Sequence, residues 1–463
     1  MRYIENIHKF KYRVLIFDYF MLAAGCMINV IAYQSFKTAV LLIFTYITSY
    51  LLMFFLRTKR PEFDVFTRTY GVGWFVAGIS GIYLNYFFDG GQNANMFFEF
   101  ATQKSQGLSI IEIQLLSEGS LAIKLWSLLY DFFDVIGIGK ERYVGVSLNI
   151  LAVSLAGVLT VKMSRLMYGN DFYRFKILGI MLSSCGILWL FAATHIRDAF
   201  IFLTVTALFY SWVYYYNKSR SIIVIVIFSA IYSFILFFLR KEFVFIPPAL
   251  LLISSMYYLF RGGNKSFFLY SKRIATGMIV VSILLYFYND VNEIILDRNQ
   301  LYSESSINSS QNNSLGLKLI VRQGLLIRAF LGSMYILIFP IPLWSGFQLD
   351  SVYHLFKSLN AIFFYFTIPM LLLSGYKLIL SQSKDYILEK FLFISVTLML
   401  ILVAITSLES RHFSVFIAPL FLLMLYPHLR DKKTRAVYFY VLFIFMFFLF
   451  FGHFIWIFVK FIY

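Results

Sequence analysis

The chain has 463 residues, of which 60% are hydrophobic, 20% aromatic and only 14% charged. Apolar runs of about 18 residues or more recur along it, which is the length that an α-helix needs to cross a bilayer. The composition excludes a soluble globular protein, and the runs are too continuous for the alternating strands of a membrane barrel. The sequence therefore predicts an all-α polytopic membrane protein forming a single integral membrane domain over residues 1–463.

Taken in order, the apolar runs predict about 13 transmembrane helices. They cover residues 14–33, 38–56, 70–88, 144–165, 177–194, 199–216, 221–239, 243–260, 274–288, 359–378, 391–407, 413–426 and 437–459. Asp18 lies inside the first run and is expected to snorkel to the surface or to pair locally near Arg13.

The charge distribution predicts the orientation. With the N-terminus inside, the short inner segments hold well over half of the 40 Lys and Arg residues, whereas most of the 23 acidic residues fall outside. This is the asymmetry of the positive-inside rule. The net charge of +17 is therefore attributed to topology, and no nucleic-acid partner is expected.

Two outer segments are long, at residues 89–142 and 289–358. In the first, residues 110–116 and 121–129 have one-sided apolarity and are too short or too charged to span, so they are expected to lie along the membrane surface. In the second, residues 303–314 form a polar low-complexity tract. Residues 314–343 are expected to form a re-entrant or interfacial helix, because a crossing there would move Arg430, Lys432 and Lys433 to the outside.

Polar residues at the outer ends of the predicted helices form the set of candidate functional residues. Most belong to three turns, at residues 194–199, 239–243 and 408–413, which are too short to reach far into water. Ionisable side chains near the apolar boundary are candidates for function. The twelve candidates are Asp89, His195, Arg197, Asp198, Arg240, Lys241, Glu242, Arg322, Arg328, Glu409, Arg411 and His412.

A structural explanation stands beside the functional one. In each turn the arginine and the carboxylate could satisfy one another at the interface. Asp89 could end a helix, because Gly90 and Gly91 follow it. The sequence contains no P-loop, dinucleotide fingerprint, zinc-ligand spacing or nucleophile elbow, so we expect no metal and no cofactor.

The pattern resembles the GT-C superfamily of membrane glycosyltransferases and, within it, a bacterial O-antigen polymerase of the Wzy type. Such proteins carry a carboxylate after a span, opening a large outer loop with surface-lying helices, and Asp89 with residues 89–142 matches this arrangement. Arg197-Asp198 and Arg240-Lys241-Glu242 match the charged outer turns of tightly connected helix pairs. The segment Pro340-Ile341-Pro342-Leu343-Trp344 is similar to a proline-tryptophan segment of sugar-polymerising members.

The resemblance implies a multi-pass protein of the bacterial inner membrane with a cytoplasmic N-terminus and a periplasmic active site. The expected substrates are undecaprenyl-diphosphate-linked oligosaccharides as donor and acceptor, and a polysaccharide chain-length regulator is a further possible partner beside the bilayer. Arg197, Arg240, Arg322 and Arg411 would bind diphosphate or sugar, with Lys241 as a point charge. Asp89 or Glu409 would take the acceptor proton, with His412 in reserve.

Two other functions stay open at this point. A lipid-linked oligosaccharide flippase would also have about a dozen spans, but it should show comparable halves, charges inside spans and short loops. An O-antigen ligase or a single-sugar GT-C transferase would share most of the same candidate residues.

Overall fold

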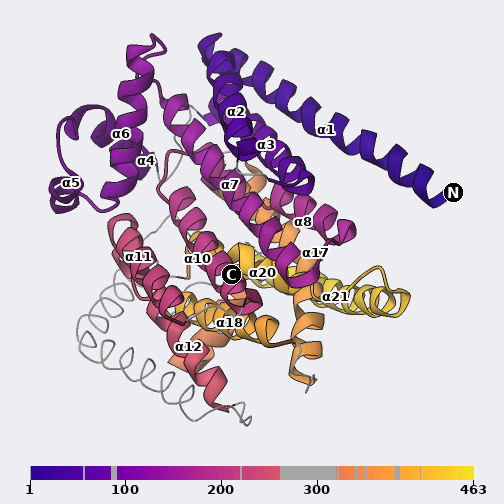
Figure 1. Cartoon of the computed structure of the whole chain (residues 1–463). Helices are drawn as coiled ribbons and strands as arrows, with labels where there is room; N and C mark the ends of the chain where they lie inside the picture. The colour runs from indigo at the N-terminus through magenta and orange to yellow at the C-terminus, as the bar shows by residue number, and fades with distance from the viewer. Residues whose placement is uncertain are drawn as a thin grey trace. The chain divides into compact units, whose positions relative to one another are not determined.

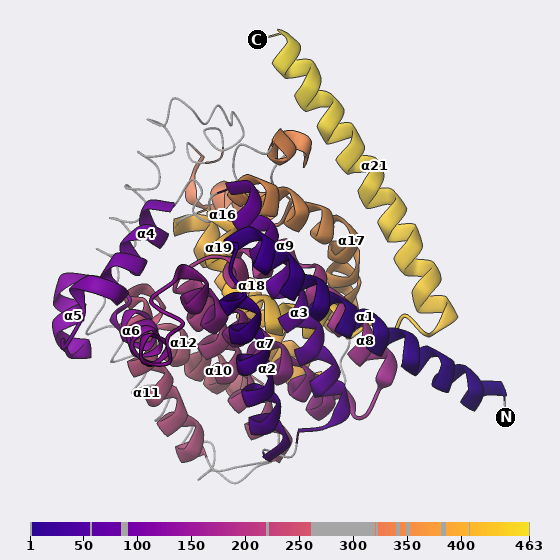
Figure 2. The same cartoon turned by 90° about the horizontal axis from the view of Figure 1, so that it is seen from above.

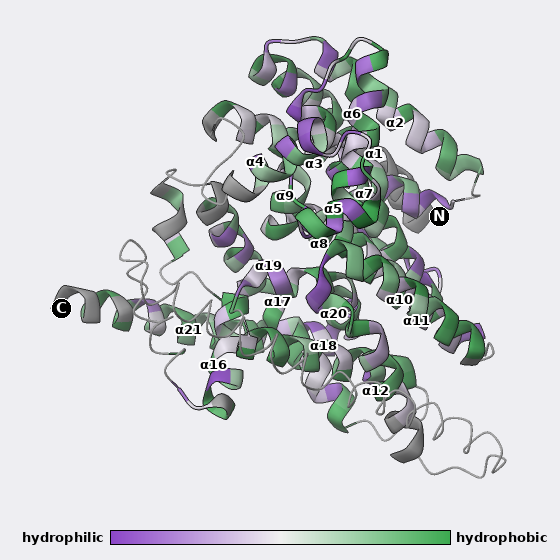
Figure 3. Cartoon of the chain, turned by 90° about the vertical axis from the view of Figure 1, so that its left-hand side faces the viewer, coloured by the Kyte–Doolittle hydropathy of each residue, from purple (hydrophilic) through white to green (hydrophobic). Residues whose placement is uncertain are grey.

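A computed structural model describes residues 2–55, 58–84, 91–218, 222–260, 320, 323–338, 343–348, 352–380, 386–406 and 408–462. Every regular element within these ranges is a helix, and none is a strand (Figure 1). The predicted all-α class is confirmed. Among the described residues, seven helices are long and apolar enough to cross a membrane, or eight if one bent helix pair is a single span. Hydrophobic residues dominate these long helices (Figure 3).

The helices divide between two compact units. Unit 1 comprises Met1–Tyr210 and Trp344–Phe363, and unit 2 comprises Ser211–Leu343 and Phe364–Tyr463. In the first part of the chain the elements are α1 (Arg2–Tyr33), α2 (Lys37–Phe55), α3 (Arg60–Leu84), α4 (Gly91–Glu99), the π-helix η1 (Phe100–Lys104), α5 (Ile110–Leu116), α6 (Ser120–Val135), α7 (Arg142–Tyr168), α8 (Phe172–Ser184), α9 (Gly186–Ala193) and α10 (Asp198–Lys218). The later elements are α11 (Ile222–Leu239), η2 (Lys241–Phe243), α12 (Ile246–Phe260), α16 (Leu325–Ile338), η3 (Leu343–Gln348), α17 (Val352–Leu380), α18 (Ile387–Thr406), α19 (Ser410–Phe413), η5 (Ser414–Phe416), α20 (Ile417–Met424) and α21 (Lys432–Ile462).

Most of the predicted spans coincide with these helices. Candidate spans include Ile16–Tyr33, Lys37–Phe55, Arg142–Tyr168 and Asp198–Lys218, and the predicted run at 177–194 is the bent pair α8 and α9. The predicted span at 70–88 was too short at its start, because α3 begins at Arg60. The predicted run at 274–288 and the polar tract at 303–314 lie outside the described residues.

In unit 1, α1 and α3 pack backbone against backbone (Figure 2). A Cβ atom added at Gly71 would lie 2.9 Å from the Leu22 backbone nitrogen, so only glycine fits at this crossing. The Asn29 side-chain amide donates hydrogen bonds of 2.7 Å to the Gly25 carbonyl and 2.6 Å to the Trp74 carbonyl. Small residues with an interhelical amide are a common way to hold membrane helices together.

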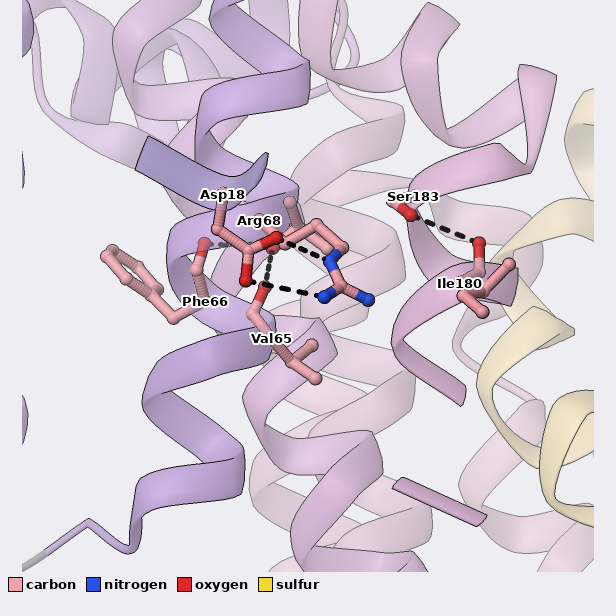
Figure 4. A network of polar contacts seen from close by, with 7 residues as sticks. Asp18, Val65, Phe66, Arg68, Ile180 and Ser183 are labelled. Atoms are coloured by element: carbon pink, nitrogen blue, oxygen red, sulfur yellow. Dashed lines mark hydrogen bonds and ion pairs between the residues drawn. The ribbon is translucent and has the colours of Figure 1, made fainter. Parts of the chain in front are cut away.

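The same helix pair contains a buried ion pair, which corrects the expectation for Asp18. Its carboxylate accepts hydrogen bonds of 2.7 Å from Nε and 3.3 Å from Nη2 of Arg68 (Figure 4). Asp18 is 1% exposed and Arg68 is 7% exposed. The carboxylate therefore pairs with a residue of α3 and does not depend on a local partner or on snorkelling, because α3 brings a guanidinium to the same depth.

A break between α8 and α9 is also built into unit 1. The two helices meet at Cys185 with a bend of 59°. The indole N–H of Trp189 donates a 2.8 Å hydrogen bond to the Ser183 carbonyl, which the break would otherwise release from the helix. A Cβ added at Gly186 would lie 2.6 Å from the Phe356 carbonyl oxygen, so the break lets α17 approach closely. Backbone groups freed by a broken membrane helix need such partners.

In unit 2, α16 packs along α18. A Cβ added at Gly332 would lie 2.7 Å from the Leu408 side chain and 3.1 Å from Ala404 Cβ. α16 has 14 residues, fewer than the roughly 20 that a full crossing requires. The re-entrant or interfacial placement of this segment stays a prediction.

Candidate functional sites in two helix-end clusters

The described candidate residues fall into two groups, one in each unit. We call the residues around the turn from α9 to α10 the His195 cluster, and it contains His195, Arg197 and Asp198. We call the second group the arginine cluster, and its members are Arg240, Lys241, Glu242, Arg328, Glu409, Arg411 and His412. Asp89 and Arg322 lie outside the described residues.

The turn of the His195 cluster is held by one buried amide from α7. Asn149 Nδ2 donates hydrogen bonds of 2.6 Å to the Thr194 carbonyl and 2.9 Å to the Ile196 carbonyl. Asn149 Oδ1 accepts a 3.1 Å hydrogen bond from the indole N–H of Trp126 on α6. Both N–H groups and the oxygen of this amide are thereby engaged, so the turn is fixed against two other helices.

His195 itself is fully buried between aromatic rings. Its imidazole stacks on the Trp126 ring with centroids 3.9 Å apart, and its Nε2 lies 3.0 Å from the hydroxyl oxygen of Tyr130. Gly145 on α7 makes this meeting possible, because an added Cβ would overlap both the Tyr130 hydroxyl and the imidazole. The ring is therefore positioned by α6 and α7 together.

Burial sets the protonation state of this pair. Desolvation, together with a smaller effect of the charge of Arg142, lowers the pKa of His195 from 6.5 to about 3. Burial also raises the pKa of Tyr130 well above its ordinary value. The tyrosine thus keeps its proton and can donate it to Nε2, while Nδ1 of His195 is buried with no hydrogen-bond partner in any other described residue. A neutral imidazole with this pKa is a weak base, which suits binding better than proton abstraction.

Cations line the same cluster over aromatic faces. The Arg197 guanidinium lies 5.6 Å from the Phe97 ring centroid, and the Arg142 guanidinium lies 5.1 Å from the Phe98 ring centroid. Arg197 Nη2 is also 3.2 Å from Glu118 Oε2, in the connection between α5 and α6. Asp198, which opens α10, is 5% exposed. The ion pair supports the structural explanation for Arg197, because it satisfies the charge from another element.

The arginine cluster begins at the turn after α11. Arg240 is 8% exposed, its Nε lies 3.3 Å from Glu242 Oε2, and its guanidinium lies 5.2 Å from the Phe243 ring centroid. Lys241, between them in sequence, is exposed. The Phe243 ring packs on Phe416 of η5 with centroids 6.3 Å apart. This turn therefore lies against the helical segment that starts just after Glu409.

Arg328 approaches the same segment from α16. It is 6% exposed, and its Nε donates a 3.4 Å hydrogen bond to the Ala404 carbonyl near the end of α18. One turn later, Gly332 contacts Leu408. The fold thus brings a buried guanidinium of α16 to the end of α18, where the chain turns toward the next candidate residues.

The turn from α18 to α19 carries the remaining three candidates. Leu408 has a φ of 52°, a left-handed conformation that costs a non-glycine residue about 1 kcal/mol. Glu409 is half-buried at the N-cap of α19, where its side chain makes no capping hydrogen bond. Arg411 is half-buried and His412 is 3% exposed. A strained turn that presents a carboxylate, a guanidinium and an imidazole is a common feature of functional sites.

Several residues of these clusters were missed by the sequence reasoning. Tyr130, Trp126, Asn149, Glu118 and Gly145 all shape the His195 cluster. Of these, Asn149 could have been singled out from the sequence, because it is a polar amide within a long apolar run. No three His, Cys, Asp or Glu side chains come together as metal ligands in the part of the chain that the structure describes.

Comparison with protein-family models, curated proteins and solved structures finds no match to this chain. Its helix lengths and hydropathy alone establish a multi-span helical membrane protein, for which the lipid bilayer is the natural surrounding.

Proposed function

We propose that this chain is a glycosyltransferase that polymerises polyprenyl-diphosphate-linked oligosaccharide repeat units, as in O-antigen or a related surface polysaccharide. It would work on the outer face of a bacterial inner membrane, with about 13 spans, a cytoplasmic N-terminus and outer loops at 89–142 and 289–358. Undecaprenyl-diphosphate-linked oligosaccharides would serve as donor and acceptor, and a chain-length regulator is a possible further partner.

One observation carries this proposal: two buried arginines of unit 2 flank a helix end that bears further ionisable groups. The Arg240 guanidinium lies over the Phe243 ring, which packs on Phe416 of η5. Arg328 donates a hydrogen bond to a carbonyl in the last turn of α18. A guanidinium is expensive to bury in apolar surroundings and is retained where it has a use. Its planar fork binds two phosphate oxygens at once, which suits a lipid diphosphate.

The chemistry assigned to these residues is one displacement. The acceptor hydroxyl oxygen forms a bond to the anomeric carbon, the bond from that carbon to the diphosphate oxygen breaks, and the lipid diphosphate leaves with the electron pair. Glu409 would take the hydroxyl proton, with His412 or Asp89 as the other candidates. Arg240, Arg322, Arg328 and Arg411, with Lys241, would hold the diphosphate, and Glu242 would orient the Arg240 guanidinium that it contacts.

The His195 cluster would contribute to sugar binding. Aromatic side chains and a neutral imidazole offer apolar faces with few polar atoms, as binding sites for small molecules commonly do. Arg197 and Asp198 would add polar contacts at the same turn.

Deletion of the gene followed by gel analysis of surface polysaccharide tests the proposal. A polymerase mutant should lose the ladder and keep a single repeat unit. Arg240→Ala and Arg411→Ala at normal expression should reproduce that phenotype, whereas Lys104→Ala should not, since Lys104 and Glu99 form an exposed pair 3.9 Å apart. Wild-type ladders in both arginine variants would overturn the assigned site.

A flippase is the second candidate, and the buried pair of Asp18 and Arg68 favours it. Paired charges inside the helix bundle are typical of proteins that move polar substrates across the membrane. Deletion would then remove every repeat from the surface, including the single unit. A ligase would differ again, because its loss leaves the polymer on the lipid carrier.

A further inference from the structure

The guanidinium of Arg68 spends only part of its hydrogen-bonding capacity on Asp18. Its Nε and Nη2 donate to the two carboxylate oxygens. Nη1 carries two further N–H groups, and neither of them donates a hydrogen bond to any residue that the structure describes. Because Arg68 is 7% exposed, a donor left without an acceptor at this depth is costly. An acceptor from outside the described chain would remove that cost.

The edge of the guanidinium that carries Nη1 faces α8. Figure 4 shows the guanidinium between Asp18 on one side and α8, which carries Ile180, on the other. A Cβ atom added at Gly179 of α8 would lie only 3.1 Å from Nη1. A larger side chain at this position would press on the guanidinium and cover it. Glycine therefore leaves Nη1 uncovered on the α8 side.

A second cation lies one turn earlier on α8. Lys176 is exposed, and it stands between Phe172 and Ile180, which are 70% and 47% exposed. The three residues are four positions apart and so share one face of the helix, which is the face that meets lipid. The positive charge of Arg68 acts on the Lys176 ammonium. The two cations are thus close enough to repel each other, and an anion between them would relieve the repulsion.

The neighbouring carboxylates Glu62 and Asp171 have arginines of their own. Glu62 of α3 forms an ion pair with Arg165 of α7, and Asp171 pairs with Arg174 at 3.6 Å. Neither carboxylate therefore supplies the acceptor that Nη1 needs. We call Nη1 of Arg68 and Nζ of Lys176, with the space beside Gly179, the Arg68–Lys176 site.

We propose that the Arg68–Lys176 site binds one phosphate group, supplied by the headgroup of an anionic phospholipid or by free inorganic phosphate. Nη1 and Nζ would donate hydrogen bonds to its oxygens. A guanidinium and an ammonium are both strong phosphate ligands, the first through its planar fork and the second as a point charge. Basic residues between membrane helices are a recurrent form of lipid headgroup site.

The position of Lys176 explains how a lipid could reach the site. Its exposed neighbours Phe172 and Ile180 would lie against acyl chains, while the long lysine side chain carries its charge to the level of the headgroups. The site uses none of the residues assigned to glycosyl transfer. The inference therefore does not depend on the proposed function, and a negative result in one leaves the other unchanged.

Equilibrium binding to the full chain in a neutral detergent tests the proposal. The probes are tritiated phosphatidylglycerol and radiolabelled inorganic phosphate, each measured by scintillation proximity at a fixed ionic strength. The main variant is Lys176→Gln, because an exposed lysine can be replaced without disturbing the core. The second variant is Asp18→Leu with Arg68→Met, which removes the guanidinium and leaves no unpaired charge.

Arg60→Gln is the matched control. Arg60 is an exposed cation at the start of α3, so its replacement removes the same charge from the same helix as the loss of Arg68. Elution of each variant as a single peak in gel filtration shows that it is folded. If the double variant fails this criterion, Lys176→Gln against Arg60→Gln decides the question alone.

We expect saturable binding of at least one probe, a several-fold weaker affinity in Lys176→Gln, and no saturable binding in the double variant. Arg60→Gln should bind as the parent does. Binding of phosphatidylglycerol alone identifies the lipid as the source of the phosphate, and binding of inorganic phosphate identifies the free ion. The proposal is overturned if neither probe binds, or if Lys176→Gln and Arg60→Gln have the same affinity.

Discussion

The hydroxyl oxygen of Tyr130 lies 3.0 Å from Nε2 of His195, and the two side chains meet in the space that Gly145 leaves free. The tyrosine comes from α6, the histidine from the turn after α9, and the glycine from α7. Three elements therefore have to be placed correctly before this hydrogen bond can form. The contact reports the packing of the whole His195 cluster.

Gly145→Ala should disrupt that packing. The added methyl group would overlap both the Tyr130 hydroxyl and the imidazole, so we expect a loss of about 1–3 kcal/mol in unfolding free energy. Thermal unfolding in detergent, followed by tryptophan fluorescence, measures the change. Gly452→Ala in α21 is the matched control, because open space surrounds that position, and its unfolding midpoint should not fall. Equal midpoints for the two variants would contradict the close contact.

The stability of the protein should depend on the ionisation of His195. The folded-state pKa is about 3, below the ordinary 6.5, so the unfolded chain binds a proton that the folded chain does not. The stability is complete above pH 6.5 and falls as the pH drops toward 3. Between pH 7 and pH 5 we expect a loss of about 2 kcal/mol from this group.

Chemical denaturation at a series of pH values measures that loss. His195→Gln has no titrating ring, so its stability should fall less steeply than that of the parent over the same interval. Carboxylates titrate in both proteins and cancel in the comparison. Identical pH profiles would show that the buried imidazole does not have the lowered pKa.

Asn149→Ala should loosen the turn that carries His195. The substitution removes hydrogen bonds to the Thr194 and Ile196 carbonyls and from the Trp126 indole, and we expect a loss of about 2–4 kcal/mol. The same unfolding assay measures it. Asn95→Ala is a suitable control, because Asn95 Oδ1 accepts no hydrogen bond among the described residues. A loss in Asn149→Ala no larger than in this control would argue against the clamp.

Breaking the pair of Asp18 and Arg68 should be costly from either side. Asp18→Ala leaves a buried guanidinium unpaired, with an expected loss of about 3–5 kcal/mol. The double variant Asp18→Leu with Arg68→Met should recover most of that loss, because neither charge remains. Glu99→Ala, which breaks an exposed pair, should change the stability by about 0.5 kcal/mol or less. A double variant as unstable as the single one would mean that the loss comes from removing the pair itself and not from leaving one charge buried without a partner.

The helices were the part of the fold that could be predicted from sequence, because apolar periodicity is a local property. The predicted helix at 110–116 coincides with α5, whereas the one at 121–129 is the first part of the longer α6. α3 extends before its apolar run because Arg60, Glu62 and Arg68 belong to the same helix. A prediction based on hydropathy missed this N-terminal extension of α3, because the extension contains charged residues.

The partners within the clusters could not be predicted in the same way. Arg68 is 50 residues from Asp18, and Tyr130 is 65 residues from His195, so their contacts depend on which helices pack together. The segments at 194–199, 239–243 and 408–413 lie at helix ends, as the apolar runs on either side of them predict. Their apolar neighbours, such as Gly145, carry no signal of their own in a single sequence.

The bend at Cys185 determines the position of the turn that follows α9. α9 has eight residues, or about 12 Å at 1.5 Å per residue, and it leaves the direction of α8 by 59°. The end of α9 is therefore offset sideways by about 10 Å from the point that a straight helix would reach. A substitution that straightened this joint would move the imidazole of His195 away from Tyr130 without altering a single residue in contact with either ring.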